Sequence, residues 1–85
     1  MKQFKYTITD PQGIHARPAG DLVKAISGFS SAITMQKGEK SVDAKRIFGI
    51  MSLAAKQGDE ITIIVEGEDE EEAMVAIKKI LENQL

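Results

Sequence analysis

The stretch FKYTITDPQGIHARPAGDLVKAI, residues 4–26, decides how the fold begins, because two hydrophobic periodicities meet in it. Apolar and polar residues alternate from Phe4 to Thr9, which predicts a half-buried strand. The next segment, Asp10–Gly13, is rich in turn-forming residues. A helix is then expected from about Ala16 to Ser27, because its apolar residues share one face: Ala19, Leu22, Val23 and Ile26.

The rest of the chain continues these two periodicities. Ile33–Gln36 alternates as a second strand, Lys37–Glu39 predicts a hairpin turn, and a short third strand follows through Ser41–Val42. A short helix is expected over Arg46–Ala54, and a fourth strand over Ile61–Glu66. The last helix runs to the end of the chain, with an apolar stripe of Ala73, Ile77, Ile80 and Leu81.

Two helix ends carry specific signals. Gly28 is expected to close the first helix in a left-handed conformation. Asp69 is expected to cap the last helix, with Glu72 at the reciprocal position of a capping box. The acidic run Glu66–Glu72 is then explained by the favourable position of carboxylates in a first helical turn. Its spacing does not match a calcium-binding loop, so no metal site is expected there.

This order of elements predicts the α+β class, with the arrangement βαββαβα. Each strand has one apolar face to bury and each long helix offers one stripe. The expected architecture is therefore a four-stranded antiparallel sheet with three helices on one face. The length of 85 residues and the absence of repeats and linkers favour a single domain over residues 1–85.

Composition narrows the function further. The chain has no cysteine, which excludes disulfides and thiolate metal sites. Its 11 basic and 13 acidic residues give a net charge of −2, without the basic excess typical of nucleic-acid binders. No apolar run approaches the roughly 20 residues that span a bilayer, and no signal peptide is recognisable. We therefore expect a cytoplasmic protein with no direct nucleic-acid or membrane partner.

His15 is the only histidine, and it lies where the first helix is expected to begin. Neutral imidazole is nucleophilic near pH 7, and a helix N-terminus attracts anions. Arg17 can grip phosphate oxygens, while Pro18 suits a first helical turn. Together these features favour a histidine that accepts a phosphoryl group and passes it on. The alternatives are a structural histidine and a solvated surface arginine.

A second informative segment is Arg46–Ala54, whose apolar residues cover nearly the whole circumference of a short helix. One sheet cannot bury all of them. Ile50 and Leu53 suit the core, so some of Ile47, Phe48 and Met51 should stay exposed as a contact patch. The alternative is that a loop covers them.

At this point the chain resembles the HPr family, the histidine-containing phosphocarrier proteins of the bacterial phosphoenolpyruvate:sugar phosphotransferase system. The strongest match is the motif Gly13–Ala19, and the resemblance extends over essentially the whole chain. Further support comes from Lys40–Lys45, Ile50–Leu53 and Gly67–Glu70. The resemblance implies an open-faced β-sandwich and a phosphocarrier that is not an enzyme and needs no cofactor.

The resemblance also implies roles for individual residues. His15 would be phosphorylated on Nδ1 by enzyme I and would pass the group to enzyme IIA domains. Arg17, with the amide end of the helix at Ala16, would stabilise the phosphoryl group. The implied docking surface for these partners comprises Gly20, Arg46, Ile47, Phe48 and Met51. A monomer is expected.

Position 46 departs from many Gram-positive relatives, which carry a regulatory serine there. Arg46 cannot be phosphorylated in that way, so we expect the chain to escape that switch. A regulatory paralogue that is still phosphorylated at His15 remains an alternative. Two other classes remain open from the residues alone: a small-molecule-binding regulatory domain, and a hydrolase of acyl phosphates.

Overall fold

Four strands and three helices alternate in the order β1, α1, β2, β3, α2, β4, α3 in the computed structural model, which describes residues 1–85. The strands are β1 (Lys2–Thr7), β2 (Ala32–Lys37), β3 (Lys40–Asp43) and β4 (Glu60–Glu66). The helices are α1 (Ala16–Ile26), α2 (Ile47–Ser52) and α3 (Glu70–Gln84). The predicted order of elements is confirmed.

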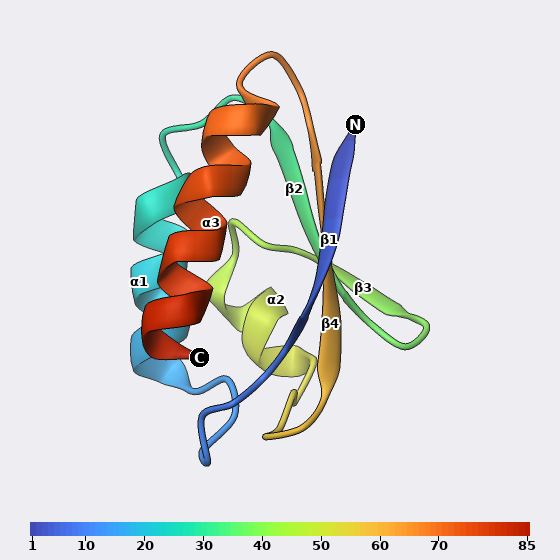
Figure 1. Cartoon of the computed structure of the whole chain (residues 1–85), viewed down its shortest axis with the longest axis vertical. Coiled ribbons are helices and arrows are strands. Elements are labelled where there is room, and N and C mark those ends of the chain that lie inside the picture. Colours follow the sequence, from blue (N-terminus) through green and yellow to red (C-terminus); the bar gives the residue numbers. More distant parts are fainter.

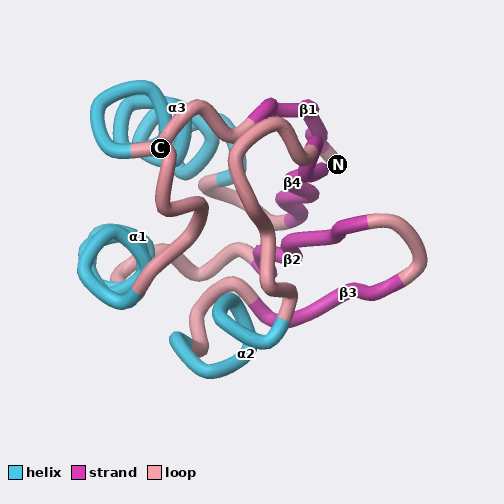
Figure 2. Tube along the Cα trace, turned by 90° about the horizontal axis from the view of Figure 1, so that it is seen from below, coloured by secondary structure: helices cyan, strands magenta, loops and turns pink.

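The four strands form one sheet in the order β1-β4-β2-β3, and every neighbouring pair is antiparallel. Strand β4 is central, since Ile63 pairs with Phe4 of β1 on one side and with Met35 of β2 on the other. All three helices lie on one side of the sheet (Figures 1 and 2). This is the predicted open-faced β-sandwich, and it belongs to the α+β class.

The core lies between the sheet and the helices, where the alternating strand pattern meets the helical stripes. Ile61, Ile63 and Val65 of β4 are fully buried. They face the helix layer, whose own buried residues include Leu22 of α1 and Ile77 of α3. Truncating any of these large side chains to alanine would cost about 2–5 kcal/mol of stability.

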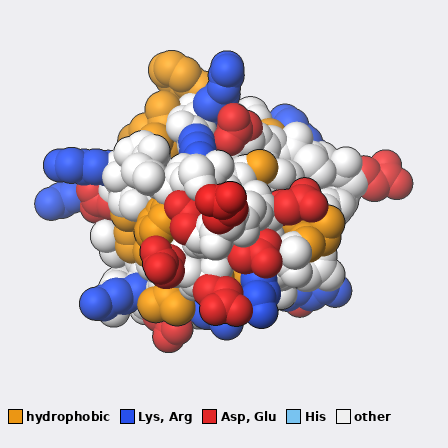
Figure 3. Space-filling model, turned by 90° about the horizontal axis from the view of Figure 1, so that it is seen from above, with side chains coloured by type: hydrophobic (Ala, Val, Ile, Leu, Met, Phe, Trp, Pro, Cys, Tyr) orange, Lys and Arg blue, Asp and Glu red, His pale blue; other side chains and the backbone are white.

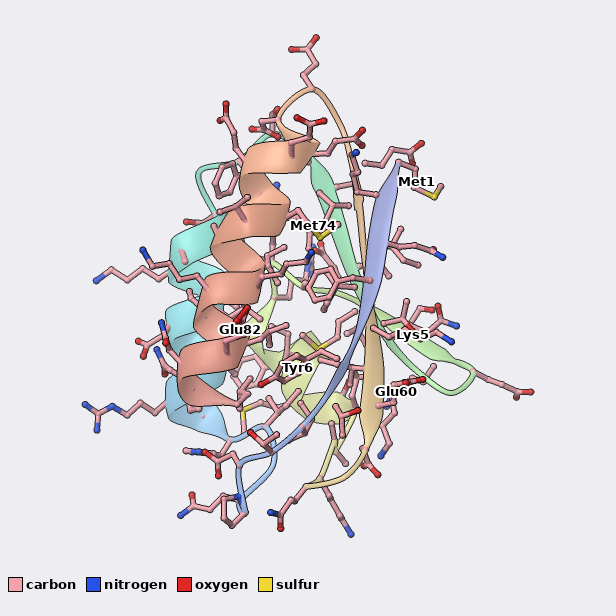
Figure 4. The ribbon with its side chains drawn as sticks, in the orientation of Figure 1. Met1, Lys5, Tyr6, Glu60, Met74 and Glu82 are labelled. Carbon is pink, nitrogen blue, oxygen red and sulfur yellow. The ribbon has the colours of Figure 1, made fainter.

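The two faces of β1 illustrate this layering (Figure 4). Tyr6 points towards the helices, where its Oη donates a 2.9 Å hydrogen bond to the carbonyl oxygen of Leu81 in α3. Lys5 points to the opposite, open face, with its Nζ 3.8 Å from a carboxylate oxygen of Glu60. The open face therefore remains polar and solvated, as expected of an antiparallel sheet that is covered on one side.

The prediction for Gly28 is wrong. The glycines with positive φ are Gly13, Gly38, Gly58 and Gly67, and Gly28 is not among them. Helix α1 ends instead at Ser27, which stays right-handed with φ −62° and ψ −24°. The amide of Phe29 then donates a 3.1 Å hydrogen bond to the carbonyl oxygen of Ile26, so a tight right-handed turn replaces the left-handed cap.

The predicted capping box at α3 is also wrong. Asp69 occupies the N-cap position, but its carboxylate makes no capping hydrogen bond to the helix. It accepts hydrogen bonds from the amides of Ser30 and Ser31, at 2.8 and 2.9 Å, and from the Ser31 hydroxyl. The carboxylate thus ties the start of α3 to the segment before β2, a long-range contact that local spacing cannot reveal. Glutamates do occupy the first turn of α3, as expected.

Candidate functional site

His15 is the N-cap residue of α1, with an extended backbone at φ −118° and ψ 177°. Its side chain is 36% exposed, so the ring is accessible to a partner molecule. The imidazole makes no capping hydrogen bond to the helix. The ring is therefore held at the amide end of α1 and remains available for chemistry.

The first turn of α1 leaves backbone donors free beside this ring. The amides of Ala16 and Arg17 have no hydrogen-bond partner within the chain, and Pro18 has no amide hydrogen to donate. The first bond of the helix runs from Ala19 to the His15 carbonyl oxygen at 3.1 Å. Free amides at the positive pole of a helix can bind a phosphoryl group.

Arg17 lies in the first turn of α1, is exposed, and forms no ion pair with any carboxylate of the chain. Its guanidinium is therefore free to meet an external anion. Pro18, by contrast, is buried and fixes the path of the first turn. The structure thus brings His15, Ala16 and Arg17 together at one helix end, as the sequence predicted.

Gly13 fixes the loop that delivers His15. It has φ +69°, and a Cβ atom there would lie 2.3 Å from the carbonyl oxygen of Ala55. The next amide, of Ile14, donates a 3.0 Å hydrogen bond to that same oxygen. Only glycine lets the backbone at residue 13 lie this close to Ala55, and the contact holds the loop before α1 against the loop after α2.

That contact joins the loop that carries His15 to the loop after α2. Helices α1 and α2 also contact each other and lie side by side in Figure 2. Ile50 and Leu53 are buried, as predicted. Phe48 is 85% exposed, Met51 is 38% exposed, and Ile47 is half-buried. No loop covers these side chains, so the exposed patch that the sequence predicted is present.

The two remaining predicted docking residues flank this patch. Gly20 of α1 faces α2, because a Cβ atom there would lie 3.6 Å from Cδ1 of Ile47. Arg46 is the N-cap residue of α2 and is largely exposed, with its Nε 3.8 Å from a carboxylate oxygen of Asp43. An exposed i,i+3 pair of this kind contributes little stability, so the guanidinium stays available to a partner.

Asp10 is a site residue that the sequence analysis missed. Its Oδ2 lies 3.5 Å from Nε2 of His15, and its side chain is 24% exposed. The sequence predicts only a turn at Asp10, and the turn is present, since its Oδ1 accepts a 2.8 Å hydrogen bond from the Gln12 amide. An aspartate whose side chain accepts a hydrogen bond from the amide two residues later is typical of this kind of turn. No sequence pattern near Asp10 predicts that its second carboxylate oxygen faces His15.

The surface around His15 is open. None of the three pockets of the molecule is lined by His15 or Arg17. The largest is formed by β2, β3 and the residues that flank them, with Ser30, Thr34 and Lys45 among its lining residues. An open histidine beside an exposed apolar patch suits a protein partner better than an enclosed metabolite. No helix of the structure has the length and apolar character needed to span a bilayer.

Comparison with known proteins agrees with this geometry. The family description "PTS HPr component phosphorylation site" matches residues 2–83. The phosphocarrier protein HPr of Lysinibacillus sphaericus is 48% identical over 81 residues, which cover 95% of this chain and 92% of that protein. The solved structure of a Mycoplasma histidine-containing phosphocarrier protein has a TM-score of 0.94 at 44% identity, covering 96% of this chain and 93% of that one. A solved HPr dimer from Thermoanaerobacter tengcongensis has a TM-score of 0.78 at 44% identity, covering 99% and 97%.

The fold and the open histidine site therefore define a phosphocarrier protein, which carries a phosphoryl group between proteins and is not an enzyme in its own right. The chain belongs to the HPr family of the phosphotransferase system, which serves sugar transport. This family membership excludes the hydrolase and the small-molecule-binding domain that the residues alone had left open.

Proposed function

We propose that His15 accepts the phosphoryl group through Nδ1 from phosphorylated enzyme I and passes it to enzyme IIA domains during sugar uptake. One observation carries this proposal: the accessible ring of His15 stands beside the unpartnered amides of Ala16 and Arg17. The Nδ1 lone pair attacks phosphorus, and the negative oxygens of the transferred group meet those amides. Because phosphoryl transfer depends mainly on positioning and electrostatics, this small set of groups is sufficient.

Arg17 is proposed to stabilise the transferred group. A guanidinium without an ion pair can offer two parallel hydrogen bonds to phosphoryl oxygens, whereas lysine would offer a point charge. The arrangement is open to solvent, which keeps the stabilisation modest. A carrier needs that balance, because it must release the group to the next protein.

The decisive experiment is loading with enzyme I and phosphoenolpyruvate, followed by mass spectrometry under alkaline conditions. The chain should gain one phosphoryl group and then stop, without continuous release of inorganic phosphate. Acid treatment should remove the added mass, because phosphohistidine is acid-labile. His15→Ala should gain nothing, and phosphorylation of that variant would refute the proposal. Transfer onward to sugar-specific enzyme IIA domains would separate a sugar carrier from a regulatory paralogue.

The docking surface is proposed to comprise Phe48 and its neighbours Gly20, Arg46, Ile47 and Met51. Phe48 is the most exposed of the large hydrophobic residues, and it lies on α2, which contacts the helix that begins at His15. The end of the molecule opposite the start of α1 carries the acidic run Glu66–Glu72, and red carboxylates gather there in Figure 3. A partner with an acidic surface would be repelled from that end and attracted to Arg17 and Arg46.

Phe48→Ala tests this surface. We expect the KM for transfer from enzyme I to rise about fivefold or more, because aromatic anchors dominate interface energies. Stability should change little, since the side chain is 85% exposed. Val75→Ala is the matched control, because Val75 is 67% exposed on α3, away from His15. Equal effects of the two substitutions on KM would contradict the proposed docking surface.

Arg46 is proposed to release this chain from regulation by serine phosphorylation while strengthening docking. Treatment with an HPr kinase and ATP should leave no phosphoserine, and modification of Ser41 or Ser52 would contradict this. Arg46→Ser should slow transfer from enzyme I a few-fold at low salt and less at high salt, because salt screens exposed charges. An equal effect at both salt concentrations would argue against an electrostatic role.

The proposed working form is a cytoplasmic monomer. The edge strand β3 has only four residues, which limits pairing between copies along that edge. The HPr of Thermoanaerobacter tengcongensis has been solved as a dimer. Sedimentation at the concentration used for transfer should give a mass close to 9.3 kDa, and a stable dimer would overturn the assignment.

A further inference from the structure

Asp10 is the carboxylate that faces the ring of His15. Its Oδ2 lies 3.5 Å from Nε2, and no other carboxylate of the chain lies within ion-pair distance of the ring. The contact is on the side of the ring away from Nδ1. It is longer than an ordinary N–H···O hydrogen bond, and contacts of this kind in unloaded sites often tighten when the partner arrives.

The fold holds this carboxylate in place before any partner binds. Its Oδ1 accepts a 2.8 Å hydrogen bond from the Gln12 amide. The Asp10 amide donates a 3.0 Å hydrogen bond to the carbonyl oxygen of Leu85, and the Asp10 carbonyl accepts one of 2.9 Å from the Gly13 amide. Thr9 also donates to Leu85, through its hydroxyl at 2.9 Å. The turn needs only Oδ1, so Oδ2 is free to act on the ring.

We propose that Asp10 is a positioning residue for phosphoryl transfer, which holds the single proton of neutral His15 on Nε2 and so leaves the Nδ1 lone pair free. This inference rests on the proposed role of His15 as phosphoryl acceptor. In neutral imidazole one nitrogen is a donor and the other an acceptor, and the partner of one decides the state of the other. A carboxylate can only accept, so it selects the tautomer with the proton on Nε2.

The same contact serves the loaded state. The Nδ1 lone pair forms a bond to phosphorus as the bond from phosphorus to the donor protein breaks, and that electron pair leaves with the donor. The ring keeps its Nε2 proton and becomes positively charged beside the Asp10 carboxylate. In onward transfer the Nδ1–P electron pair returns to Nδ1, so a neutral imidazole leaves. Loss of the Nε2 proton would instead make the leaving group an imidazolate anion, which leaves poorly.

The surrounding charges make a carboxylate useful here. Arg17 and the positive pole of α1 suit the phosphoryl oxygens but oppose a positive ring. Lys56 belongs to the loop whose backbone packs against Gly13, and it is also a cation. Asp10 is the one anion that offsets them at the ring itself. Positive groups of the site thus stabilise the phosphoryl oxygens, while the Asp10 carboxylate stabilises the proton on Nε2.

Asp10→Asn is the sharpest test because it changes one atom. The asparagine oxygen still accepts from Gln12, so the turn is kept, while an amide donor replaces Oδ2. The asparagine amide group donates a hydrogen bond, so it favours the tautomer in which Nε2 carries no proton and can accept. In that tautomer the ring proton is on Nδ1. Nitrogen-15 NMR of the unmodified ring should show mainly the Nε2–H form in the original chain. In Asp10→Asn the Nδ1–H form should rise about threefold to tenfold relative to Nε2–H, the range expected from one hydrogen bond.

Loading by phosphorylated enzyme I should slow by a similar factor in Asp10→Asn. Glu39→Gln is the control for loss of one carboxylate, because Glu39 lies at the tip of the β2–β3 hairpin, far from α1 (Figure 1). It should change neither the tautomer ratio nor the loading rate. An unchanged tautomer ratio in a folded Asp10→Asn protein would overturn the inference, as would an altered ratio with an unchanged loading rate. Failure of the original chain to accept a phosphoryl group at all would instead refute the proposed function.

Discussion

Single residues with unusual backbone angles fix the loops around the site. Four of the five residues with positive φ are glycines, and the exception is Ala54 with φ +52°. Ala54 follows α2, where lysine side chains bind the last carbonyl groups: Lys37 Nζ lies 3.2 Å from the Ala54 oxygen, and Lys40 Nζ lies 2.8 Å from the Ser52 oxygen. These contacts hold an alanine in a conformation that L-residues avoid.

Ala54→Gly should therefore stabilise the protein. Glycine adopts positive φ without strain, so the free energy of unfolding should rise by about 1 kcal/mol. Urea denaturation measures this change. Ala25→Gly is the matched control, since exposed Ala25 lies within the right-handed helix α1 and should lose about 1 kcal/mol. A loss of stability in both variants would mean that Ala54 is not strained.

At the scale of elements, the packing of α1 against α2 joins the histidine to the docking patch. Gly20 lies at this contact, next to Ile47. Glycine is unfavourable within a helix, and nothing in the sequence explains why Gly20 occupies this position. In the structure the space above Gly20 admits a methyl group, because the nearest atom would be 3.6 Å away. The glycine is therefore not required by close packing.

Gly20→Ala should raise the free energy of unfolding by about 0.5–1 kcal/mol, because alanine loses less backbone entropy in a helix. Thermal unfolding should show a higher midpoint temperature. A lower midpoint would mean that the added methyl group clashes with α2, although its expected distance from Cδ1 of Ile47 is 3.6 Å.

At the scale of the whole molecule, Asp69 connects segments that lie far apart in the chain. Hydrogen bonds from Ser31 and Ser30 hold the pKa of the Asp69 carboxyl at about 2, below its usual 3.8. The pKa values of Glu70 and Asp59 are lowered as well, chiefly by hydrogen bonds from the chain's N-terminal ammonium group and from the Lys56 amide, respectively. All three carboxylates thus favour the folded state while they are ionised.

Acid should therefore destabilise the protein in a defined window. Between pH 4 and pH 2 the unfolded chain takes up a proton at Asp69 that the folded chain does not, so stability falls as pH falls. Asp69→Asn should lower the thermal midpoint at pH 6 and reduce its dependence on pH between 4 and 2. Thermal unfolding by circular dichroism from pH 6 to pH 2 measures both. An unchanged pH dependence in the variant would rule out Asp69 as its source.

Much of the fold could be predicted because its signals are local. Alternation in Ile61–Glu66 and the helical stripe of residues 19–26 each describe one element and its buried face. The capping box failed for the opposite reason. Asp69 and Glu72 have the right spacing, but the Ser30 and Ser31 amides, 39 and 38 residues away, offer the carboxylate other donors. Spacing within one element says nothing about such competitors.

The candidate site divides in the same way. The sequence by itself determined the four-stranded sheet under three helices, and the unusual group of histidine, arginine and proline at a helix start, since both depend on neighbours within a few residues. Only the tertiary structure decided that Asp10 faces His15 and that α2, with its patch, contacts the helix that begins at His15. The β1–α1 loop is fixed by backbone hydrogen bonds to Ala55 and Leu85. Contacts between residues so far apart in the chain produce no periodic pattern in the sequence, so they could not be predicted from it.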